Sequence, residues 1–271
     1  MRTLLLIIAL VAPRLDAQEP TISMRIDLVA WGDNITGLSL KPGHAKGGVT
    51  ALAFRYSTPV SYSGPVVMEI YKSGDGMTND TPKPSAEDLE HQLQPLLADA
   101  SNPASGDAAK PKQGLALELE KRREKNPSLV ALAALPGYGC RQATVLLAPA
   151  DGGTFTAYVI DDDPSKLRPG QLRVHNLSPM QIALRCNGAP GKELKTLESF
   201  IPPVQNNQLI YELAYKLGDE WRIQENNIIP IRENEQTQMI ILKSNNQFFL
   251  STDGGSGGFL QAVTLRRRAL P

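Results

Sequence analysis

Short runs of strand-forming residues, each closed by a turn signal, constrain the fold of this chain more than any other feature. The 271 residues include 21 Pro and 22 Gly, and these two residue types punctuate short segments. The stretch from Thr154 to Gly188 shows the full pattern: a strand, an acidic turn, a Pro-Gly turn, a second strand, a Ser-Pro turn and a third strand. We interpret this stretch as the junction between two β-rich domains of an all-β protein.

The part of the chain before this junction contains several predicted strands. Residues 22–30 have apolar side chains at every second position, which indicates a half-buried strand. Residues 142–148 and 154–161 flank a Pro-Ala-Asp-Gly-Gly turn, which predicts a β-hairpin. About seven strands fit here, the number in a simple immunoglobulin-like sandwich. We therefore predict a first immunoglobulin-like β-sandwich domain over residues 18–163.

A long insertion interrupts this series at residues 73–126. Residues 73–84 are rich in Gly, Asp, Asn, Thr and Pro, and residues 99–113 contain few large apolar side chains, so both predict loop. Leucines at helical spacing between them indicate a short helix, and the insertion is expected to be partly helical or disordered. Residues 115–125 combine alternating Leu with a helix-forming composition. For these we favour a strand that passes into an exposed charged turn.

A second series of short strands begins after residue 164 and predicts a second immunoglobulin-like β-sandwich over residues 164–271. Its clearest hairpin joins Tyr215 to Trp221 through a Leu-Gly-Asp turn. Apolar residues near the middle of predicted strands are expected to form the two cores. These are Phe54, Ile70, Leu132, Val145, Tyr158, Val174, Ile182, Leu213, Trp221 and Ile240.

The N-terminal residues 1–17 have the features of a secretory signal peptide. Arg2 precedes an apolar run of about nine residues, and Ala17 is a small residue at the expected cleavage point. The run is too short for a membrane span, which needs about twenty residues. We expect the mature chain to begin near Gln18 and to be periplasmic or extracellular.

Formal charge is balanced, with 28 basic and 28 acidic side chains. A balanced chain has no long-range field to attract nucleic acid or an anionic membrane, so neither is an expected partner.

The chain has two cysteines, Cys140 and Cys186. An oxidising compartment would allow a disulfide between them, which would tie the second domain to the first. The spacing is equally compatible with two buried thiols, and without a nearby His it does not indicate a zinc site.

The sequence contains no recognisable catalytic motif. Its three histidines, His44, His91 and His175, do not form a spacing that pairs a nucleophile with a base, and no Ser lies in a Gly-x-Ser-x-Gly elbow. We interpret all three as surface or packing residues. We therefore expect no catalytic residue, no bound metal and no cofactor.

The acidic triplet Asp161, Asp162 and Asp163 is the densest cluster of carboxylates. Calcium favours several oxygen ligands, but the EF-hand spacing is absent. We favour a solvated interdomain turn for the triplet. The same reasoning assigns the Gly-rich residues 254–258 to a hairpin tip and the basic run 266–268 to a solvated strand end.

Residues 167–178 contain the pattern Pro-Gly-x-x-Arg-x-x-Asn-x-Ser, which begins at Pro169 and ends at Ser178. The pattern resembles the opening of a β-domain in uncharacterised secreted bacterial β-sandwich proteins. It is also similar to a strand in the periplasmic adaptor proteins of alginate acetylation. This resemblance covers about a sixth of the chain; it implies an exported β-protein and assigns no catalytic residue.

These observations favour an exported, non-enzymatic scaffold or binding protein of the cell envelope, whose partner is another envelope protein. One alternative is a carbohydrate-binding module that stacks a glycan on Trp31, Tyr62 and Trp221. Another is a hydrolase in which Asp161 and Glu220 meet across the cleft between the domains.

Overall fold

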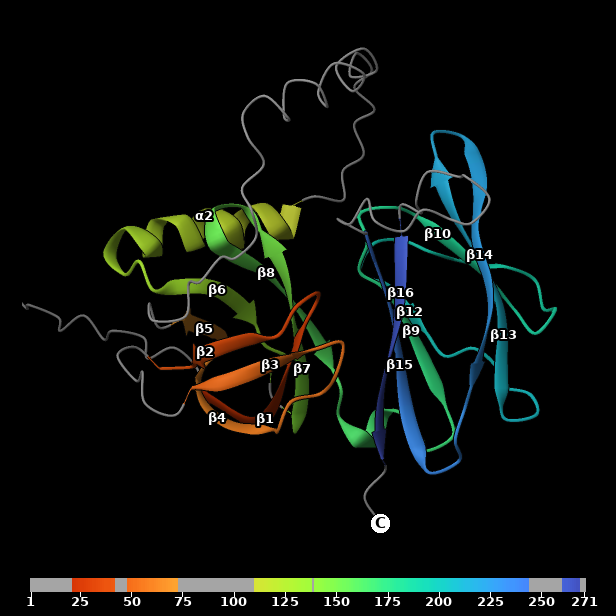
Figure 1. The fold of residues 1–271 in the computed structure, drawn as a ribbon, viewed down its shortest axis with the longest axis horizontal. Helices are drawn as coiled ribbons and strands as arrows, with labels where there is room; N and C mark the ends of the chain where they lie inside the picture. The colour runs from red at the N-terminus through yellow and green to blue at the C-terminus, as the bar shows by residue number, and fades with distance from the viewer. Residues whose placement is uncertain (1–20, 42–47, 73–109, 138, 244–259, 269–271) are drawn as a thin grey trace, which may run out of the picture.

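The computed structural model describes residues 21–41, 48–72, 110–137, 139–243 and 260–268 (Figure 1). The expected signal peptide, His44, His91 and the Gly-rich residues 254–258 lie outside these ranges. The described part is mostly β-structure, with the helix α2. The elements are β1 (Thr21–Ala30), β2 (Ile35–Ser39), β3 (Val49–Ala53), β4 (Val60–Pro65), β5 (Val67–Lys72), α2 (Lys110–Lys125), β6 (Leu129–Ala134), β7 (Gln142–Ala150), η2 (Asp151–Gly153), β8 (Thr154–Asp161), η3 (Pro164–Lys166), β9 (Leu172–Asn176), β10 (Ile182–Cys186), β11 (Lys192–Leu194), β12 (Ser199–Phe200), β13 (Gln208–Leu217), β14 (Glu220–Pro230), β15 (Glu235–Lys243) and β16 (Leu260–Arg268).

Strands β1 to β8 form one eight-stranded sheet, here called the N-terminal unit. β1 lies at its centre and pairs in parallel with β3 and β7 and antiparallel with β4. The sheet order β6-β5-β2-β3-β1-β7-β8 places β6 and β8 at the two ends, yet these two strands lie close in space. The sheet therefore curls almost into a barrel around a core that includes Ile26, Leu28 and Val145.

Helix α2 lies against this unit (Figure 1) and corrects the expectation of a strand at residues 115–125. Leu115 and Leu119 are one helical turn apart and pack in one cluster with Leu129 and Leu132 of β6. Leu117, between them in the sequence, is 66% exposed. The alternating leucines therefore do not share a buried face, and the helix-forming composition decides the local structure.

Strands β9 to β16 form two four-stranded sheets, here called the C-terminal unit. One sheet has the order β11-β10-β13-β14 and the other the order β12-β9-β15-β16. The inner faces of both sheets supply a common core, to which Val174, Ile182, Leu213 and Met239 belong. β9 pairs with β15 in parallel, while the other pairs in this unit are antiparallel.

Most of the expected core positions are buried. Phe54 and Tyr158 are half-buried at the junction between the units, and Trp221 is 40% exposed. The prediction that Trp221 is buried is wrong, because β14 is an edge strand whose outer face no described element covers. The buried positions are Ile70, Leu132, Val145, Val174, Ile182, Leu213 and Ile240.

Cys140 and Cys186 are both buried free thiols in the structure. Cys140 belongs to the core of the N-terminal unit and Cys186 to that of the C-terminal unit. Burial raises the pKa of each thiol to about 11, so both are protonated at neutral pH.

No helix in the described ranges combines the length and the apolar character needed to cross a membrane.

Candidate functional site

The acidic triplet 161–163 begins the connection between the units, and two of its members hold that connection in place. Asp163 accepts hydrogen bonds from Nε and Nη2 of Arg141, at 3.2 and 3.1 Å, and it caps η3 by accepting from the Ser165 amide. The Arg141 guanidinium holds the pKa of Asp163 well below its usual range. Asp161 pairs with Lys166.

The third carboxylate, Asp162, is buried at the centre of an ionic network between the units. Nη2 of Arg267, on β16, lies 2.9 Å from Oδ2 of Asp162 and 2.7 Å from Oδ2 of Asp27, on β1. Thr144 Oγ1 and Gln238 Nε2 also donate to Asp162, at 2.8 and 2.7 Å. This arrangement corrects two expectations: the triplet is not a solvated turn, and the basic run 266–268 includes a side chain that is only 16% exposed.

The Arg267 guanidinium has a third contact, with the ring of Tyr56, whose centroid lies 4.4 Å from Cζ. Gln142 Nε2 donates to Asp27 Oδ2 at 2.6 Å on the other side of the network. Burial raises the pKa of Asp27, while the charge of Arg267 opposes that rise. The guanidinium therefore sits between two buried carboxylates and an aromatic face.

His175 lies at the edge of the same network, on β9. Its Nε2 is 2.9 Å from Oε1 of Gln238, and Gln238 uses its amide nitrogen for Asp162. Burial lowers the pKa of His175 to about 4, so the imidazole is neutral at pH 7. With the Gln238 amide oriented in this way, Nε2 of His175 is the donor.

The triplet does not form a calcium site, because its carboxylates face three different cations. The described ranges contain no group of three or more acidic, His or Cys side chains arranged to hold a metal ion.

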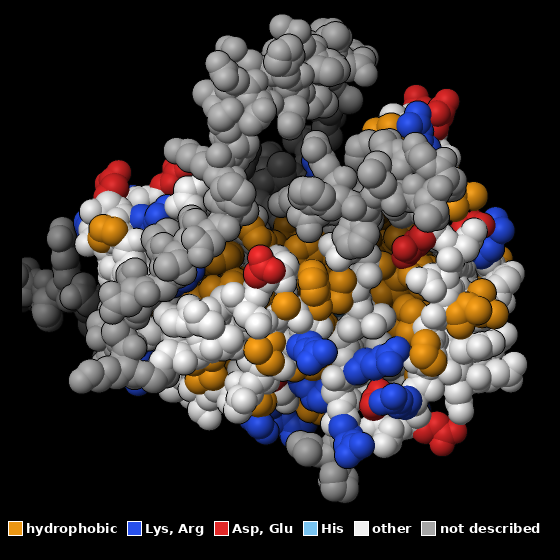
Figure 2. Space-filling model, in the orientation of Figure 1, with side chains coloured by type: hydrophobic (Ala, Val, Ile, Leu, Met, Phe, Trp, Pro, Cys, Tyr) orange, Lys and Arg blue, Asp and Glu red, His pale blue; other side chains and the backbone are white. Residues whose placement is uncertain are grey.

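An apolar cluster surrounds this ionic network. Val29 and Leu146 of the N-terminal unit pack in it with Ile240 and Leu265 of the C-terminal unit. Trp31 also belongs to the cluster, and its ring meets Phe54 edge to face at 5.4 Å between centroids. The contact between the two units therefore resembles a protein core in composition. Figure 2 shows hydrophobic side chains gathered along this contact.

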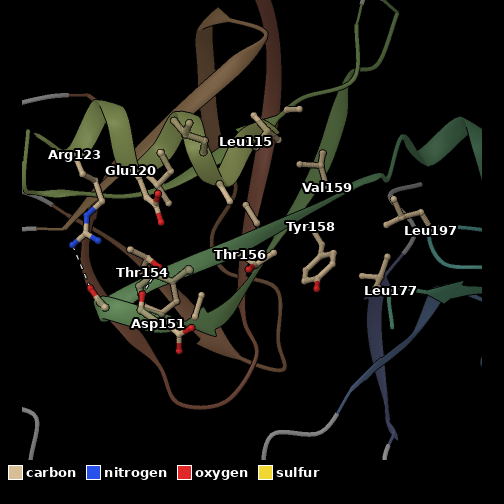
Figure 3. Close-up of a pocket in the computed structure, with 18 residues that line it drawn as sticks. Leu115, Glu120, Arg123, Asp151, Thr154, Thr156, Tyr158, Val159, Leu177 and Leu197 are labelled. Carbon is tan, nitrogen blue, oxygen red and sulfur yellow. Dashed lines mark hydrogen bonds between the residues drawn. The ribbon is translucent and has the colours of Figure 1, made fainter. Parts of the chain in front are cut away.

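Next to the junction lies a pocket of about 630 Å³, and it forms where the curled sheet stays open between β6 and β8 (Figure 3). Helix α2 covers the opening, η2 closes one end, and residues of the C-terminal unit reach the other end (Figure 3). The wall is largely apolar. Its apolar side chains include Leu115, Leu119, Leu132, Phe155, Val159, Leu177 and Leu197.

Charged side chains gather at the η2 end of the pocket. Arg123 of α2 crosses to η2, where its Nη2 donates to the carbonyl oxygen of Gly152 at 3.3 Å (Figure 3). Nε of Arg123 is buried and has no hydrogen-bond partner among the described residues. Glu120 and Asp151 line the same end, and both are exposed to solvent.

No pattern in the sequence predicts this pocket, because helix α2, which covers it, is a segment for which the sequence favours a strand. Its other wall, β8, was predicted correctly as a strand. β6 and β8 approach each other without pairing because the whole sheet curls. Local residue patterns do not encode the curvature of a sheet.

The structure does not bring together the residues of the two alternative functions, the hydrolase and the carbohydrate-binding module. Asp161 pairs with Lys166, while Glu220 lies at the turn of the β13–β14 hairpin near Arg222, and no contact between described residues joins the two carboxylates. Trp31 and Tyr62 are buried, so they do not form a stacking surface with the exposed Trp221.

The pattern Asn-x-Ser at residues 176–178 has a structural explanation. Nδ2 of the buried Asn176 donates to the carbonyl oxygens of Met180 and Leu194, at 2.7 and 3.1 Å. Its Oδ1 accepts from the amide and the hydroxyl of Ser178, at 3.1 and 2.6 Å. The two side chains thus build the turn between β9 and β10.

A second exposed feature is the β13–β14 hairpin at the edge of the C-terminal unit. Trp221, Ile223 and Ile228 on β14 are 40%, 64% and 55% exposed. Ile228 lies opposite Ile210 of β13, which is also exposed, so the apolar side chains share the outer face.

The chain fits no protein-family model, and no curated protein is significantly similar to it.

Proposed function

We propose that this protein is an exported, non-enzymatic binding protein of the cell envelope, and that its ligand site is the pocket between α2 and β8. The observation that carries the proposal is the concave, mostly apolar space of about 630 Å³ with a few charged groups at one end. Pockets for small organic ligands have this volume range and this composition, and they are common where two units of a protein meet.

The contacts of α2 support a preformed site. Arg122 pairs with Glu69 of β5 and with Glu118 one helical turn earlier. Tyr71 donates a hydrogen bond to the same Glu69, so the carboxylate that joins the helix to the sheet through Arg122 is itself held in place. A wall held in this way needs little rearrangement when a ligand enters.

The experiment is a titration of the mature chain with N-phenyl-1-naphthylamine, an uncharged apolar dye that fluoresces in apolar surroundings. We expect saturable binding at one site. Ala116→Trp places an indole at the pocket, since Ala116 lines it, and should weaken binding at least about tenfold, or about 1.4 kcal/mol.

The matched control is Leu117→Trp at the next position of α2, which is exposed and does not line the pocket. It should leave the affinity for the dye unchanged. Equal dye binding by both variants, or no saturable binding by the unmodified chain, would contradict the proposal.

A second candidate function is a scaffold that binds an extended segment of an envelope protein along β14. Exposed apolar side chains on an edge strand favour this, because an edge strand offers unpaired backbone groups to an added strand. A photoreactive residue at position 223 should crosslink to one discrete partner in intact cells. The same residue at position 193, on exposed β11, serves as the control.

We also infer an immunoglobulin-like relationship for the C-terminal unit. Its two packed four-stranded sheets support this.

A further inference from the structure

We propose that the ligand of the pocket is an elongated amphipathic carboxylate, with its carboxylate on Arg123 and its apolar chain along β8. This inference rests on the proposed function, since it names the class of ligand for the same site.

Arg123 supplies the reason for an anionic head group. Among the buried side-chain atoms without a hydrogen-bond partner in the described residues, only Arg123 Nε belongs to the pocket lining. Arg123 forms no ion pair with a described carboxylate, and its Nη2 donates to the carbonyl oxygen of Gly152 at 3.3 Å. A buried N–H donor without an acceptor is unfavourable, and a ligand carboxylate would supply one once a turn of the Arg123 side chain brings Nε to the surface of the pocket.

The guanidinium chemistry points to a carboxylate in particular. Its Nε and Nη donors lie in one plane and match the two oxygens of a carboxylate. In the structure one Nη of Arg123 is held by Gly152. Nε is the buried donor of this guanidinium that has no partner among the described residues.

The shape of the pocket supplies the reason for a long apolar chain. Arg123 lies at one end and Leu177 and Leu197 lie at the other, with β8 running between them (Figure 3). The wall between the two ends includes Phe155 and Val159. A ligand with a single charge at one end of an apolar body would match this order of side chains.

Glu120 and Asp151 limit how much charge the ligand carries. Both carboxylates are exposed, so water and salt screen their repulsion of a head group held at the buried Nε of Arg123. Arg123 is the one cation among the described residues that line the pocket, so a second anionic group at its mouth would meet the two carboxylates without a compensating charge. The arrangement therefore favours a monocarboxylate over a diacid.

The test compares dodecanoate with dodecan-1-ol, which has the same chain length and no charge, by displacement of N-phenyl-1-naphthylamine from the full mature chain. Both are used below their aggregation limits. We expect dodecanoate to bind at least about tenfold more tightly than the alcohol, as a charge-assisted hydrogen bond implies.

Arg123→Gln should abolish this preference, so that dodecanoate and dodecan-1-ol displace the dye equally well. Arg123→Lys keeps the charge without the planar fork and should retain part of the preference. Lys121→Gln is the matched control, because Lys121 is an exposed cation of α2 outside the pocket lining.

The outcomes separate the two proposals. Equal affinity for dodecanoate and dodecan-1-ol, with both weakened by Ala116→Trp, would overturn the assignment of the head group and leave the pocket as a ligand site. A preference that persists in Arg123→Gln would overturn the role of Arg123. If neither compound displaces the dye and Ala116→Trp does not affect dye binding, the proposed function itself fails.

Discussion

The junction between the two units buries charge, whereas the β13–β14 hairpin exposes hydrophobic side chains. Asp27 and Asp162 are almost fully buried around Arg267. Ile223, on the edge strand β14 of a four-stranded sheet, is 64% exposed. Both regions consist of long strands with mixed polarity, so residue polarity alone does not decide which side chain is covered. The decisive factor is whether another layer of the protein lies on that face.

Strand β1 shows this effect within ten residues. Its first five positions, from Thr21 to Arg25, alternate between exposed and buried, as expected for a strand with one solvated face. From Ile26 to Ala30 every residue is buried. The change begins beside Asp27, where Arg267 of the C-terminal unit approaches. β14 is the opposite case, because no described element covers its outer face.

The largest expected effect on stability comes from removing one carboxylate of the buried ion pairs at the junction. Asp162→Ala would leave Arg267 with one carboxylate and would remove the acceptor for Thr144 and Gln238. We expect the free energy of unfolding to fall by about 3–5 kcal/mol, the usual result of removing one partner from a buried ion pair. Urea unfolding at pH 7 measures this change.

The control for Asp162→Ala is Asp151→Ala, since Asp151 is an exposed carboxylate. The control should change stability by less than about 0.5 kcal/mol. A similarly small loss for Asp162→Ala would show that the network does not stabilise the junction.

The second prediction compares the stability effects of substitutions on the two faces of the sheet that contains the β13–β14 hairpin. Leu213 on β13 is fully buried, and Leu213→Ala should cost about 2–5 kcal/mol through lost burial and the cavity left behind. Ile223→Ala on the adjacent strand should cost less than about 0.5 kcal/mol. Thermal unfolding of both variants checks the pair. A large loss for Ile223→Ala would mean that its side chain is covered in solution.

The smallest effect is a pH dependence from His175. Its pKa is about 4 in the folded protein and about 6.5 when exposed, so the unfolded chain takes up a proton first as the pH falls. The imidazole therefore costs no stability above pH 6.5 and reduces stability between pH 6.5 and pH 4. Between pH 7 and pH 5 the loss should be about 2 kcal/mol.

Urea unfolding at several pH values measures this slope, and His175→Gln is the variant to compare. The variant should lose less stability between pH 7 and pH 5 than the unmodified chain. If the stability of His175→Gln and that of the unmodified chain changed equally with pH, the pH dependence would come from groups other than His175.

The all-β class and most of the strands could be predicted from the sequence, because alternation and turn residues act locally. Residues 154–161 were predicted as a strand and form β8. The parallel pairs of β1 with β3 and β7 could not be predicted, since they join segments far apart in the chain. For the candidate site, the sequence placed β8 but missed α2, and with it Arg123. It also missed the pairing of Asp162 with Arg267, because each looked like an ordinary surface charge.

The ion pair between Asp27 and Arg267 spans 240 residues of sequence. Asp27 lies on β1 and Arg267 on β16, so a chain that is still being synthesised leaves Asp27 and Asp162 without the guanidinium that pairs with both. The N-terminal unit therefore cannot pair the buried carboxylate of Asp27 before β16 has been synthesised and has docked. This links the folding of the two units into one late step, and long-range closure of this kind makes folding slow. Until that step the apolar side chains of the junction, Val29 and Leu146 among them, lack the layer that covers them in the folded protein.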